Sequence, residues 1–462
     1  MIQEDTIAAI STAPGEAGIG VIRISGPEAL GLSLPLFMAG NEQPGASPVP
    51  RRMVYGRIVD PATREMVDEV LYCYMKAPYT YTREDVVEIQ CHGGSQSLQR
   101  IMALLLARGV RPAEPGEFTK RAFLNGRLDL SQAEAVMDLI RAKTRQGHQA
   151  AATQLEGALS RKVHQLRTRL METMATMEVA IDFSEEEDVD DVTAESLVTI
   201  FDTLLSELER LIESARTGRI YREGVKTVIV GKPNVGKSSL MNALLRESRS
   251  IVTDIPGTTR DAIEEQLNLR GIPVVLMDTA GIRETDDLVE RLGVEKTHQF
   301  FDRADLVLVM LDASVPLTEE DRFILEMIRE KKALVIINKT DLPARLTEEQ
   351  LPEWIAKDQL LRISLLEAQD VLLLEEALTH LIFERELGET RGEMVTNLRH
   401  QLALEAAREA LKDGKHALEQ QMPLDFVQVD VQTAMDHLGE IVGEVVREDL
   451  VDYIFSHFCI GK

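Results

Sequence analysis

The sequence is poor in cysteine and in long apolar runs. Its three cysteines, Cys73, Cys91 and Cys459, are too few for a disulfide framework and lack the spacing of structural zinc ligands, which favours a reducing compartment. No apolar run approaches the roughly 20 residues that a membrane-spanning helix needs. The first five residues are acidic where a secretory signal is basic, so we expect a cytoplasmic protein with no membrane partner.

Positive charge is also scarce. Lys and Arg number 51 against 77 Asp and Glu, which gives a formal charge of −26. Broad, non-specific binding to nucleic acid needs a net basic surface, so this class of function is disfavoured, although a local basic patch is not excluded. Solubility is the simplest interpretation of the charge. A chain of 462 residues predicts two to four domains.

The first half of the chain changes from mixed to helical patterning. Residues 1–125 have strand patterns, as at 21–25 and 86–90, and a helical pattern at 95–108. Residues 131–180 contain no proline and only two glycines, a composition typical of long packed helices. The acidic run at 184–191 is best interpreted as a solvated loop before a helix that begins near Val192; a site for a cation or a basic partner is the lesser alternative.

The region between about 223 and 381 alternates strand and helix patterns. The apolar run at 305–311 is typical of a central strand that is covered on both faces. We therefore expect an open, mostly parallel sheet with helices on both faces and ligands at the carboxyl ends of its strands. Helices before 218 and after 382 would pack together around this inserted domain. The expected strands are 226–230, 263–269, 273–277, 305–311, 333–337 and 361–364.

A phosphate-binding loop follows the first of these strands. Residues 231–238, Gly-Lys-Pro-Asn-Val-Gly-Lys-Ser, match its pattern and precede a helical stretch, which is the context that the motif requires. The glycines let backbone amides wrap the phosphates at a helix N-terminus. Lys237 would reach the β- and γ-phosphates, and Ser238 would bind Mg²⁺.

Three further motifs occur in the order of a GTPase. The stretch 278–281, Asp-Thr-Ala-Gly, would place Asp278 in the Mg²⁺ shell and the Gly281 amide at the γ-phosphate. The stretch 338–341, Asn-Lys-Thr-Asp, carries a carboxylate that accepts two hydrogen bonds from guanine, which adenine cannot offer. Thr258 and Thr259 lie where a switch threonine senses the γ-phosphate. Together the four motifs predict a GTP-hydrolysing enzyme.

Two details depart from Ras-like enzymes. The glutamine that positions the attacking water is replaced by Ile282, so another group must perform this task. The phosphate loop also carries Asn234, whose amide oxygen could join carbonyls of the loop at 257–261 in a cage for a monovalent cation. The simpler alternative for Asn234 is a side chain that caps its own loop.

These residues resemble one family closely, the MnmE (TrmE) tRNA-modification GTPases. The resemblance spans nearly the whole chain, from Asp5 to the last residue. Outside the nucleotide region it rests on the stretches GIGVIRISG at 18–26, YTREDVVE at 81–88 and RPAEPGEF at 111–118. Its most specific part is the terminal Cys-Ile-Gly-Lys, residues 459–462.

The resemblance implies a domain plan and partners. An N-terminal domain, 1–125, would bind tetrahydrofolate and dimerise; a helical domain would combine 126–222 with 382–462; and 223–381 would be the inserted Ras-like GTPase domain. Family members act as homodimers, which form a heterotetramer with MnmG, an FAD- and NADH-dependent protein that works on tRNA with them. The two install an aminomethyl or carboxymethylaminomethyl group on C5 of the wobble uridine of certain tRNAs. The one-carbon donor is 5-formyl- or 5,10-methylene-tetrahydrofolate.

The folate site that the resemblance implies would use Arg23, Glu88, Arg127 and Lys462. A pterin can hydrogen-bond a carboxylate, and the glutamate tail of a folate favours Arg or Lys. Some members have Lys in place of Arg127, which keeps the charge but changes its geometry. Surface ion pairs are the plain alternative for each residue. Cys459 would lie near this site and is needed for modification in the family; a buried hydrophobe and a thiolate nucleophile both stay open.

In the nucleotide region the resemblance assigns K⁺ and Mg²⁺ ligands and a catalytic group. Glu290 would orient the attacking water through a second water, with Glu284, Asp286 and Asp287 as nearby rivals. The backbone amide of Ser364 would meet guanine O6. K⁺ would be bound by Asn234, Thr253, Ile255 and Thr258, and Mg²⁺ by Ser238 and Thr259. The full nucleotide set is Asn234, Val235, Gly236, Lys237, Ser238, Ser239, Thr253, Asp254, Ile255, Pro256, Gly257, Thr258, Thr259, Asp278, Thr279, Ala280, Gly281, Asn338, Lys339, Asp341 and Ser364.

Two alternatives belong to other classes of protein. A ribosome-assembly or RNA-chaperone GTPase of the Era or Der type shares the Gly-x-Pro-Asn loop, but such proteins append a KH-type domain. No Gly-x-x-Gly loop flanked by basic residues follows residue 382. A folate-dependent one-carbon transferase with a regulatory GTPase would transfer carbon without MnmG.

Overall fold

The computed structural model describes residues 5–40, 48–182, 194–247, 265–277, 303–383 and 393–462. Contacts divide the chain into two units, which are described separately. One comprises Met1–Met137, Leu155–Val192 and Gln420–Lys462, and the other Asp138–Gln154 and Thr193–Glu419. In the described part of the chain, no helix combines the length and the apolar character needed to cross a membrane.

A seven-stranded sheet forms the centre of the first unit. Its strand order is β3-β4-β5-β6-β2-β1-β7, and every neighbouring pair is antiparallel except β1 and β7. Alternation of buried and exposed side chains along β5 shows that the two faces have different environments. The strands are β1 (Ile7–Ile10), β2 (Ala17–Ser25), β3 (Phe37–Ala39), β4 (Met53–Val59), β5 (Met66–Met75), β6 (Val86–Gly93) and β7 (Arg111–Pro112).

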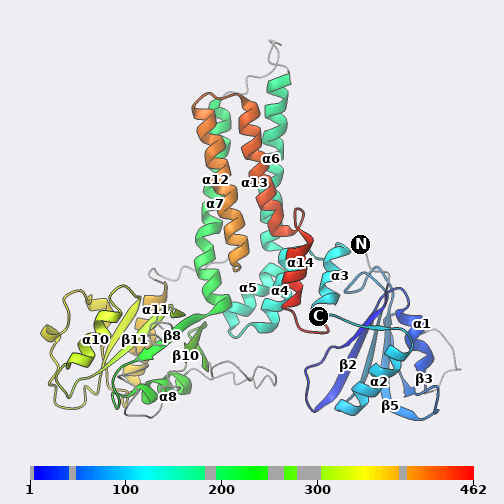
Figure 1. Cartoon of the computed structure of the whole chain (residues 1–462), viewed down its shortest axis with the longest axis horizontal. Helices are drawn as coiled ribbons and strands as arrows, with labels where there is room; N and C mark the ends of the chain where they lie inside the picture. Colours follow the sequence, from blue (N-terminus) through cyan, green and yellow to red (C-terminus); the bar gives the residue numbers. More distant parts are fainter. Residues whose placement is uncertain (1–4, 41–47, 183–193, 248–264, 278–302, 384–392) are drawn as a thin grey trace. The chain divides into compact units, whose positions relative to one another are not determined.

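Helices cover one face of this sheet. The longest, α2 (Ser95–Ala107), buries Leu98, Ile101 and Leu105 against the strands, as its helical periodicity predicts. A short helix α1 (Ala29–Ser33) and a 3-10 turn η1 (Leu34–Leu36) complete the cover. In Figure 1, α1 and α2 lie in front of the strands.

The remaining helices of this unit pack in two groups. The helix α3 (Glu117–Leu124) contacts α14 (Glu448–Ser456), and α6 (Ala158–Asp182) runs beside α13 (Leu424–Val442) (Figure 1). Segments more than 240 residues apart in the chain therefore share one hydrophobic interface, since α6 and α13 bury Leu166, Leu170 and Leu438.

The expected helical run at 131–180 is divided into three helices: α4 (Leu130–Arg141), α5 (Arg145–Leu155) and α6.

In the second unit, α7 (Ala194–Glu223) packs along α12 (Leu398–Glu419). A Cβ atom on Gly218 would collide with the Val395 carbonyl, so only glycine permits this close approach. Helical segments that flank the nucleotide region thus pack together, as the sequence predicts.

A six-stranded sheet forms the core of the second unit, in the order β13-β12-β11-β8-β10-β9. Only β9 is antiparallel to its neighbour, which confirms the mostly parallel sheet. The central strand β11 is buried along nearly all its length. The strands are β8 (Val225–Val230), β9 (Glu265–Leu269), β10 (Ile272–Met277), β11 (Leu306–Asp312), β12 (Ala333–Asn338) and β13 (Leu360–Arg362).

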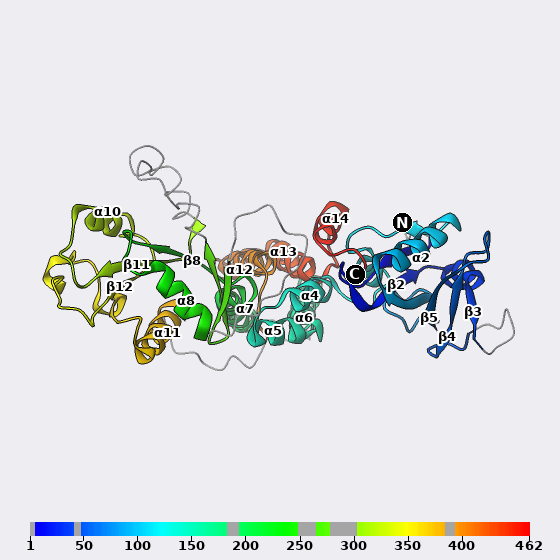
Figure 2. The ribbon, with the colours of Figure 1, turned by 90° about the horizontal axis from the view of Figure 1, so that it is seen from below.

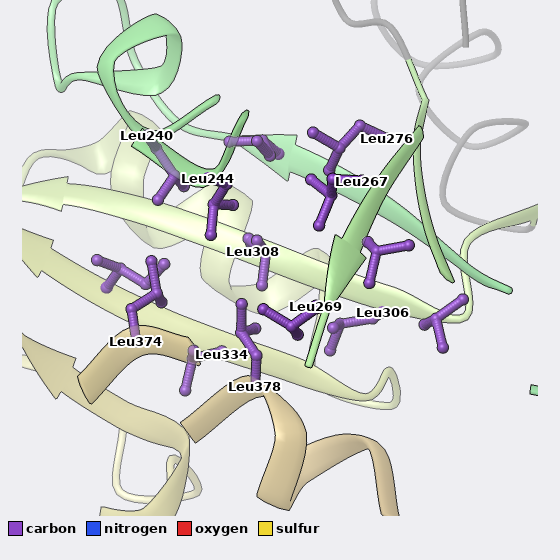
Figure 3. Packing of buried hydrophobic residues seen from close by; sticks show 14 of the residues in the cluster. Leu240, Leu244, Leu267, Leu269, Leu276, Leu306, Leu308, Leu334, Leu374 and Leu378 are labelled. Carbon is purple, nitrogen blue, oxygen red and sulfur yellow. The ribbon is translucent and has the colours of Figure 1, made fainter. Parts of the chain in front are cut away.

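Helices lie on both faces of this sheet. On one face α8 (Lys237–Glu247) and α11 (Ala368–Phe383) contribute leucines that point toward those of the strands (Figure 3). On the other face α10 (Glu319–Met327) packs through Leu325. Figure 2 shows α10 and α11 on opposite sides of the strands. Two 3-10 turns, η3 (Glu348–Gln350) and η4 (Lys357–Gln359), precede β13. The fold class expected from the sequence is therefore confirmed.

Candidate functional site

The phosphate-binding loop lies at the carboxyl end of β8 and leads into α8. Gly231 has a φ of 148°, and a Cβ atom there would lie 2.5 Å from the Met310 carbonyl oxygen. Asn234 has a φ of 65°, in the left-handed region that asparagine tolerates better than most residues. The loop conformation thus depends on the residue types at these positions.

Lys237 begins α8 and folds back over the loop. Its Nζ donates hydrogen bonds to the carbonyl oxygens of Gly231 at 2.5 Å and Lys232 at 2.8 Å. Burial lowers the pKa of Lys237 below its ordinary value. Its charge therefore lies within the loop, where phosphate oxygens would be attracted. The neighbours Ser238 and Ser239 occupy the first turn of α8.

The Asn-Lys-Thr-Asp motif lies beside this loop because β12, β11 and β8 are adjacent parallel strands. Asn338 Nδ2 donates to the Val235 carbonyl at 2.9 Å, and Lys339 Nζ donates to the Asn234 carbonyl at 2.8 Å. A Cβ atom on Gly236, which has a φ of 108°, would collide with Asn338. The structure thus brings together two motifs that lie 100 residues apart.

Asp341 is held by the loop after β13. Ser364 Oγ donates to Asp341 Oδ1 at 2.7 Å, which leaves Oδ2 as an acceptor for a ligand. The Ser364 amide, which the sequence assigned to guanine O6, instead donates to Asp370 Oδ2 at 2.6 Å. Ser364 therefore contributes to this site through its hydroxyl group, which orients the Asp341 carboxylate.

The rest of the expected nucleotide set lies outside the described residues. This applies to the switch segment, the Asp-Thr-Ala-Gly motif and the proposed catalytic glutamate with its rivals. The residues concerned are Thr253, Asp254, Ile255, Pro256, Gly257, Thr258, Thr259, Asp278, Thr279, Ala280, Gly281, Ile282, Glu284, Asp286, Asp287 and Glu290.

A second cluster of charged side chains lies in the first unit, on the face of the seven-stranded sheet opposite α2. Arg23 on β2 and Glu88 on β6 are direct cross-strand partners. Arg23 Nε donates to Glu88 Oε1 at 2.9 Å, and its terminal NH2 group lies 2.8 Å from the same oxygen. Both side chains keep about a fifth of their surface exposed (19% and 21%), so they stay accessible to a ligand.

Aromatic rings and two further cations surround this pair. The Arg23 guanidinium carbon lies 5.8 Å from the Tyr81 ring centre and 5.9 Å from that of Phe118. Arg127 lies over the same Tyr81 ring, with its guanidinium carbon 4.8 Å from the ring centre. The pKa of Lys462 is lowered, chiefly by burial and then by the Arg23 charge. The four residues expected at the folate site are thus in one neighbourhood, where three cations accompany one carboxylate.

The sequence did not single out Tyr81 and Phe118, although both lie inside stretches that carry the family resemblance. Tyr81 is anchored by a 2.9 Å hydrogen bond with Thr119 Oγ1. Cys459 is exposed, and its carbonyl accepts a hydrogen bond from the Gly116 amide at 3.3 Å. Exposure contradicts the alternative of a small buried hydrophobe. In the described residues, no group of three or more His, Cys, Asp or Glu could hold a metal ion.

Comparisons with known proteins match two ranges of the chain to family models. A family model described as the MnmE helical domain matches residues 130–459, and one described as the GTP-binding protein TrmE N-terminus matches residues 6–127. The "tRNA modification GTPase MnmE" of Alkaliphilus metalliredigens (strain QYMF) is 54% identical, with 100% of both chains covered. That of Clostridioides difficile (strain 630) is 49% identical with the same coverage. A solved structure of Era from Aquifex aeolicus is 28% identical, covers 40% of this chain and 66% of that chain, and has a TM-score of 0.25.

Proposed function

The chain belongs to the MnmE family of tRNA modification GTPases, and on this premise we propose that it is a potassium-activated GTP hydrolase of the cytoplasm. With a partner of the MnmG type, it adds an aminomethyl or carboxymethylaminomethyl group to C5 of the wobble uridine of certain tRNAs. GTP hydrolysis drives the conformational change that resets the modification site.

The observation that carries the proposal is the junction of the two nucleotide loops. Lys237 supplies a half-buried cation for the phosphates, and Asp341, oriented by Ser364, supplies the carboxylate that selects guanine. Asn338, in the Asn-Lys-Thr-Asp motif, hydrogen-bonds the Val235 carbonyl of the phosphate-binding loop and so holds the two loops together. Ser238, at the start of α8, has the hydroxyl for Mg²⁺, with Thr259 and Asp278 as the other groups that hold the ion and its water shell.

Potassium activation is supported by the position of Asn234 in this loop. Its left-handed backbone and its bonded carbonyl fix the residue at the mouth of the loop, and its side-chain oxygen is a suitable K⁺ ligand. We propose that Thr253, Ile255 and Thr258 complete the cage and that Glu290 orients the attacking water. The cation then supplies the charge that an arginine finger supplies in other GTPases.

Folate binding is supported by the charge of the cluster around Arg23. Its side chains are three cations and one carboxylate, an excess of positive charge that favours the carboxylates of a folate glutamate tail. Glu88 is placed to accept hydrogen bonds from a pterin, and the Tyr81 ring packs against the Arg23 and Arg127 guanidinium groups that would meet the carboxylates. The folate supplies the one-carbon unit, while these residues bind and orient it. Cys459 lies in the same terminal segment as Lys462, and we propose that it takes part in the modification reaction.

A homodimer is supported by the uncovered face of the seven-stranded sheet. Tyr55 and Leu71 are cross-strand partners there, and they are 55% and 37% exposed. The row beside them runs from Met53 through Cys73 to Glu88, so this apolar face is continuous with the folate cluster. In the described part of the chain, no helix packs on these exposed side chains of β4 and β5, and an exposed apolar surface of this kind favours a second copy as its partner. The proposed domain plan is 1–125, 126–222 with 382–462, and 223–381.

The first test is GTP hydrolysis at fixed ionic strength, with KCl replaced stepwise by NaCl, in the wild type and in Asn234→Ala. A potassium-specific stimulation that the variant lacks supports the proposal. Equal rates in both salts would remove the potassium mechanism and point to an arginine finger from a partner. The Era or Der alternative is not favoured, because relatives named for tRNA modification cover the whole chain.

A further inference from the structure

The segment that follows β11 makes polar contacts with both nucleotide loops, although it belongs to none of the four motifs. Asp312 ends β11 and pairs with Asn338 across the parallel strands. Its side chain is about nine-tenths buried (10% exposed). A carboxylate so deeply placed needs partners for both oxygens.

The two oxygens of Asp312 have different partners. Oδ1 accepts from the Ser314 amide at 2.8 Å and the Ser314 hydroxyl at 2.6 Å, so the side chain is fixed by its own turn. Oδ2 accepts from Lys339 Nζ at 2.6 Å. These bonds lower the pKa of Asp312 although its burial would raise it. The carboxylate therefore stays charged and presents one fixed oxygen to the lysine.

Lys339 connects the fixed Asp312 carboxylate to the phosphate-binding loop. The same Nζ that contacts Asp312 donates to the Asn234 carbonyl. Both joined residues have left-handed backbones, with φ angles of 65° at Asn234 and 63° at Lys339. Such conformations are unfavourable for residues other than glycine and persist only where the surroundings fix them.

We propose that Asp312 is a positioning residue of the nucleotide site, which acts through Lys339 to hold Asn234 and the phosphate-binding loop in the conformation that guanine nucleotide binds. This inference rests on the proposed role of these loops in nucleotide binding. It requires no contact between Asp312 and the nucleotide.

A parallel link anchors the other end of the loop. Lys232 Nζ lies 2.6 Å from Asp321 Oδ2 and 2.8 Å from Thr318 Oγ1. Thr318 and Asp321 form the capping box that begins α10, so the loop is attached to a helix start. The two nucleotide loops together contain three lysines. Lys232 and Lys339 are paired with aspartates, whereas Lys237 hydrogen-bonds only backbone carbonyls in the described part of the chain. The phosphates would therefore meet the third lysine alone.

The experiment measures the dissociation rate of a fluorescent N-methylanthraniloyl derivative of GDP from the full chain by stopped flow. Asp312→Asn keeps the shape of the side chain but removes its charge. We expect dissociation to be about tenfold faster, on the scale of one charge-assisted hydrogen bond. An unchanged rate would overturn the proposal.

Asp305→Asn is the matched control. Asp305 precedes the opposite end of the same strand, and its Oδ2 accepts from the Lys226 amide at 2.9 Å, so this variant likewise replaces a hydrogen-bonded carboxylate beside β11 by a neutral amide. We expect its dissociation rate to stay within about twofold of the wild type. A change equal to that of Asp312→Asn would show a general effect of strand stability and would contradict the proposal.

The route through Lys339 is tested by combining substitutions. If Asp312 acts only through this lysine, adding Asp312→Asn to Lys339→Met should leave the rate of the single Lys339→Met variant unchanged. Additive effects would refute the route. If Asp312→Asn fails to fold, Asp312→Glu replaces it, with an expected rate between the wild type and Lys339→Met; a wild-type rate there would refute the proposal. A wild type that binds no fluorescent GDP would instead refute the assigned nucleotide site.

Discussion

At the scale of single residues, the nucleotide loops depend on backbone conformations that few residue types adopt. Gly231, Asn234, Gly236 and Lys339 all have positive φ angles. They converge where β8 and β12 end, so their conformations are mutually constrained. Substitution at one of them should disturb the loop opposite as well as its own.

Gly236→Ala tests this dependence. The added methyl group would collide with Asn338 and would also strain the backbone at a φ of 108°. We expect the affinity for GDP, measured by calorimetry, to fall by about tenfold or more. Gly109→Ala is the control, because Gly109 has a φ of 94° but no atom within 4 Å of its Cβ position. Equal affinities in the wild type and Gly236→Ala would contradict the collision.

The folate cluster offers a second test at this scale. Arg23→Gln removes the charge that Glu88 and the Tyr81 ring hold in place. We expect the affinity for 5-formyl-tetrahydrofolate to fall by about tenfold or more. Arg57→Gln is the control, since Arg57 lies on the same sheet face opposite Glu69. A loss of similar size in both variants would mean that general surface charge, rather than this cluster, binds the ligand.

The motif residues can be located from the sequence because each motif is a local pattern with a known chemical demand. Lys237, Asn338 and Asp341 could be found in this way. The sequence did not predict Asp312, Tyr81 or Phe118, because their roles come from neighbours on other strands and helices. The engagement of the Ser364 amide by Asp370 was also beyond reach, since it depends on how the loop after β13 meets the start of α11.

At the scale of elements, a buried ion cluster joins the beginning of the chain, β7 and α3. Glu117 is only 5% exposed and receives hydrogen bonds from Arg111 and Arg121. Both arginines also contact Asp5, and Arg121 contacts Glu84. Charges this deep stabilise a fold only while every partner is present. Because Glu117 and Arg121 belong to α3, the cluster fixes the position of this helix.

Glu117→Gln should reduce the free energy of unfolding by about 3 kcal/mol, because it leaves the arginines incompletely paired. Urea unfolding of the full chain, followed by circular dichroism, measures the change. The control is Asp452→Asn, which removes the exposed pair with Lys120 and should cost less than about 1 kcal/mol. Equal losses would show that burial of Glu117 has no special effect.

The same carboxylate predicts a pH dependence. Burial alone would raise the pKa of Glu117, but hydrogen bonds from Arg111, the Glu114 amide and Arg121 lower it below the ordinary 4.5. Its stabilising contribution is therefore complete above pH 4.5 and is lost as the pH falls through the lowered pKa. Unfolding free energies measured between pH 6 and 3 should decline more steeply in the wild type than in Glu117→Gln. Parallel curves would contradict this assignment.

Elements were predicted from sequence to within a few residues where their pattern was strong. The apolar run of β11 and the periodicity of α2 are examples. The sequence did not show where the helical run at 131–180 divides into α4, α5 and α6. Its only two residues that disfavour helix are glycines, and one of them, Gly147, lies inside α5. The first sheet was only partly predicted, since its strand order joins β1 to β7 across 100 residues, and such pairing leaves no local pattern.

At the scale of the whole molecule, the uncovered face of the first sheet is where the proposed second copy would bind. Leu71→Glu places a charge in the middle of that face, and sedimentation velocity should then show a monomer. Leu106→Glu is the control, because Leu106 is similarly exposed (39% against 37%) but lies on α2, which covers the opposite face. A dimer that persists in Leu71→Glu would place the contact elsewhere.

The close approach of Gly218 and Val395 has a mechanical consequence. The chain leaves α7 at Glu223, and Val395 returns to that same helix, where the Val395 amide donates to Ser214 Oγ at 3.1 Å. Gly218 and Glu223 are about 8 Å apart along a helix. Tension applied along the polypeptide would thus pass from α7 to the segment before α12 without stretching the sheet that binds nucleotide. The six-stranded sheet also contacts α7 through β10, so we expect force applied to α7 and α12 to be carried by the Gly218–Val395 contact before it reaches the strands.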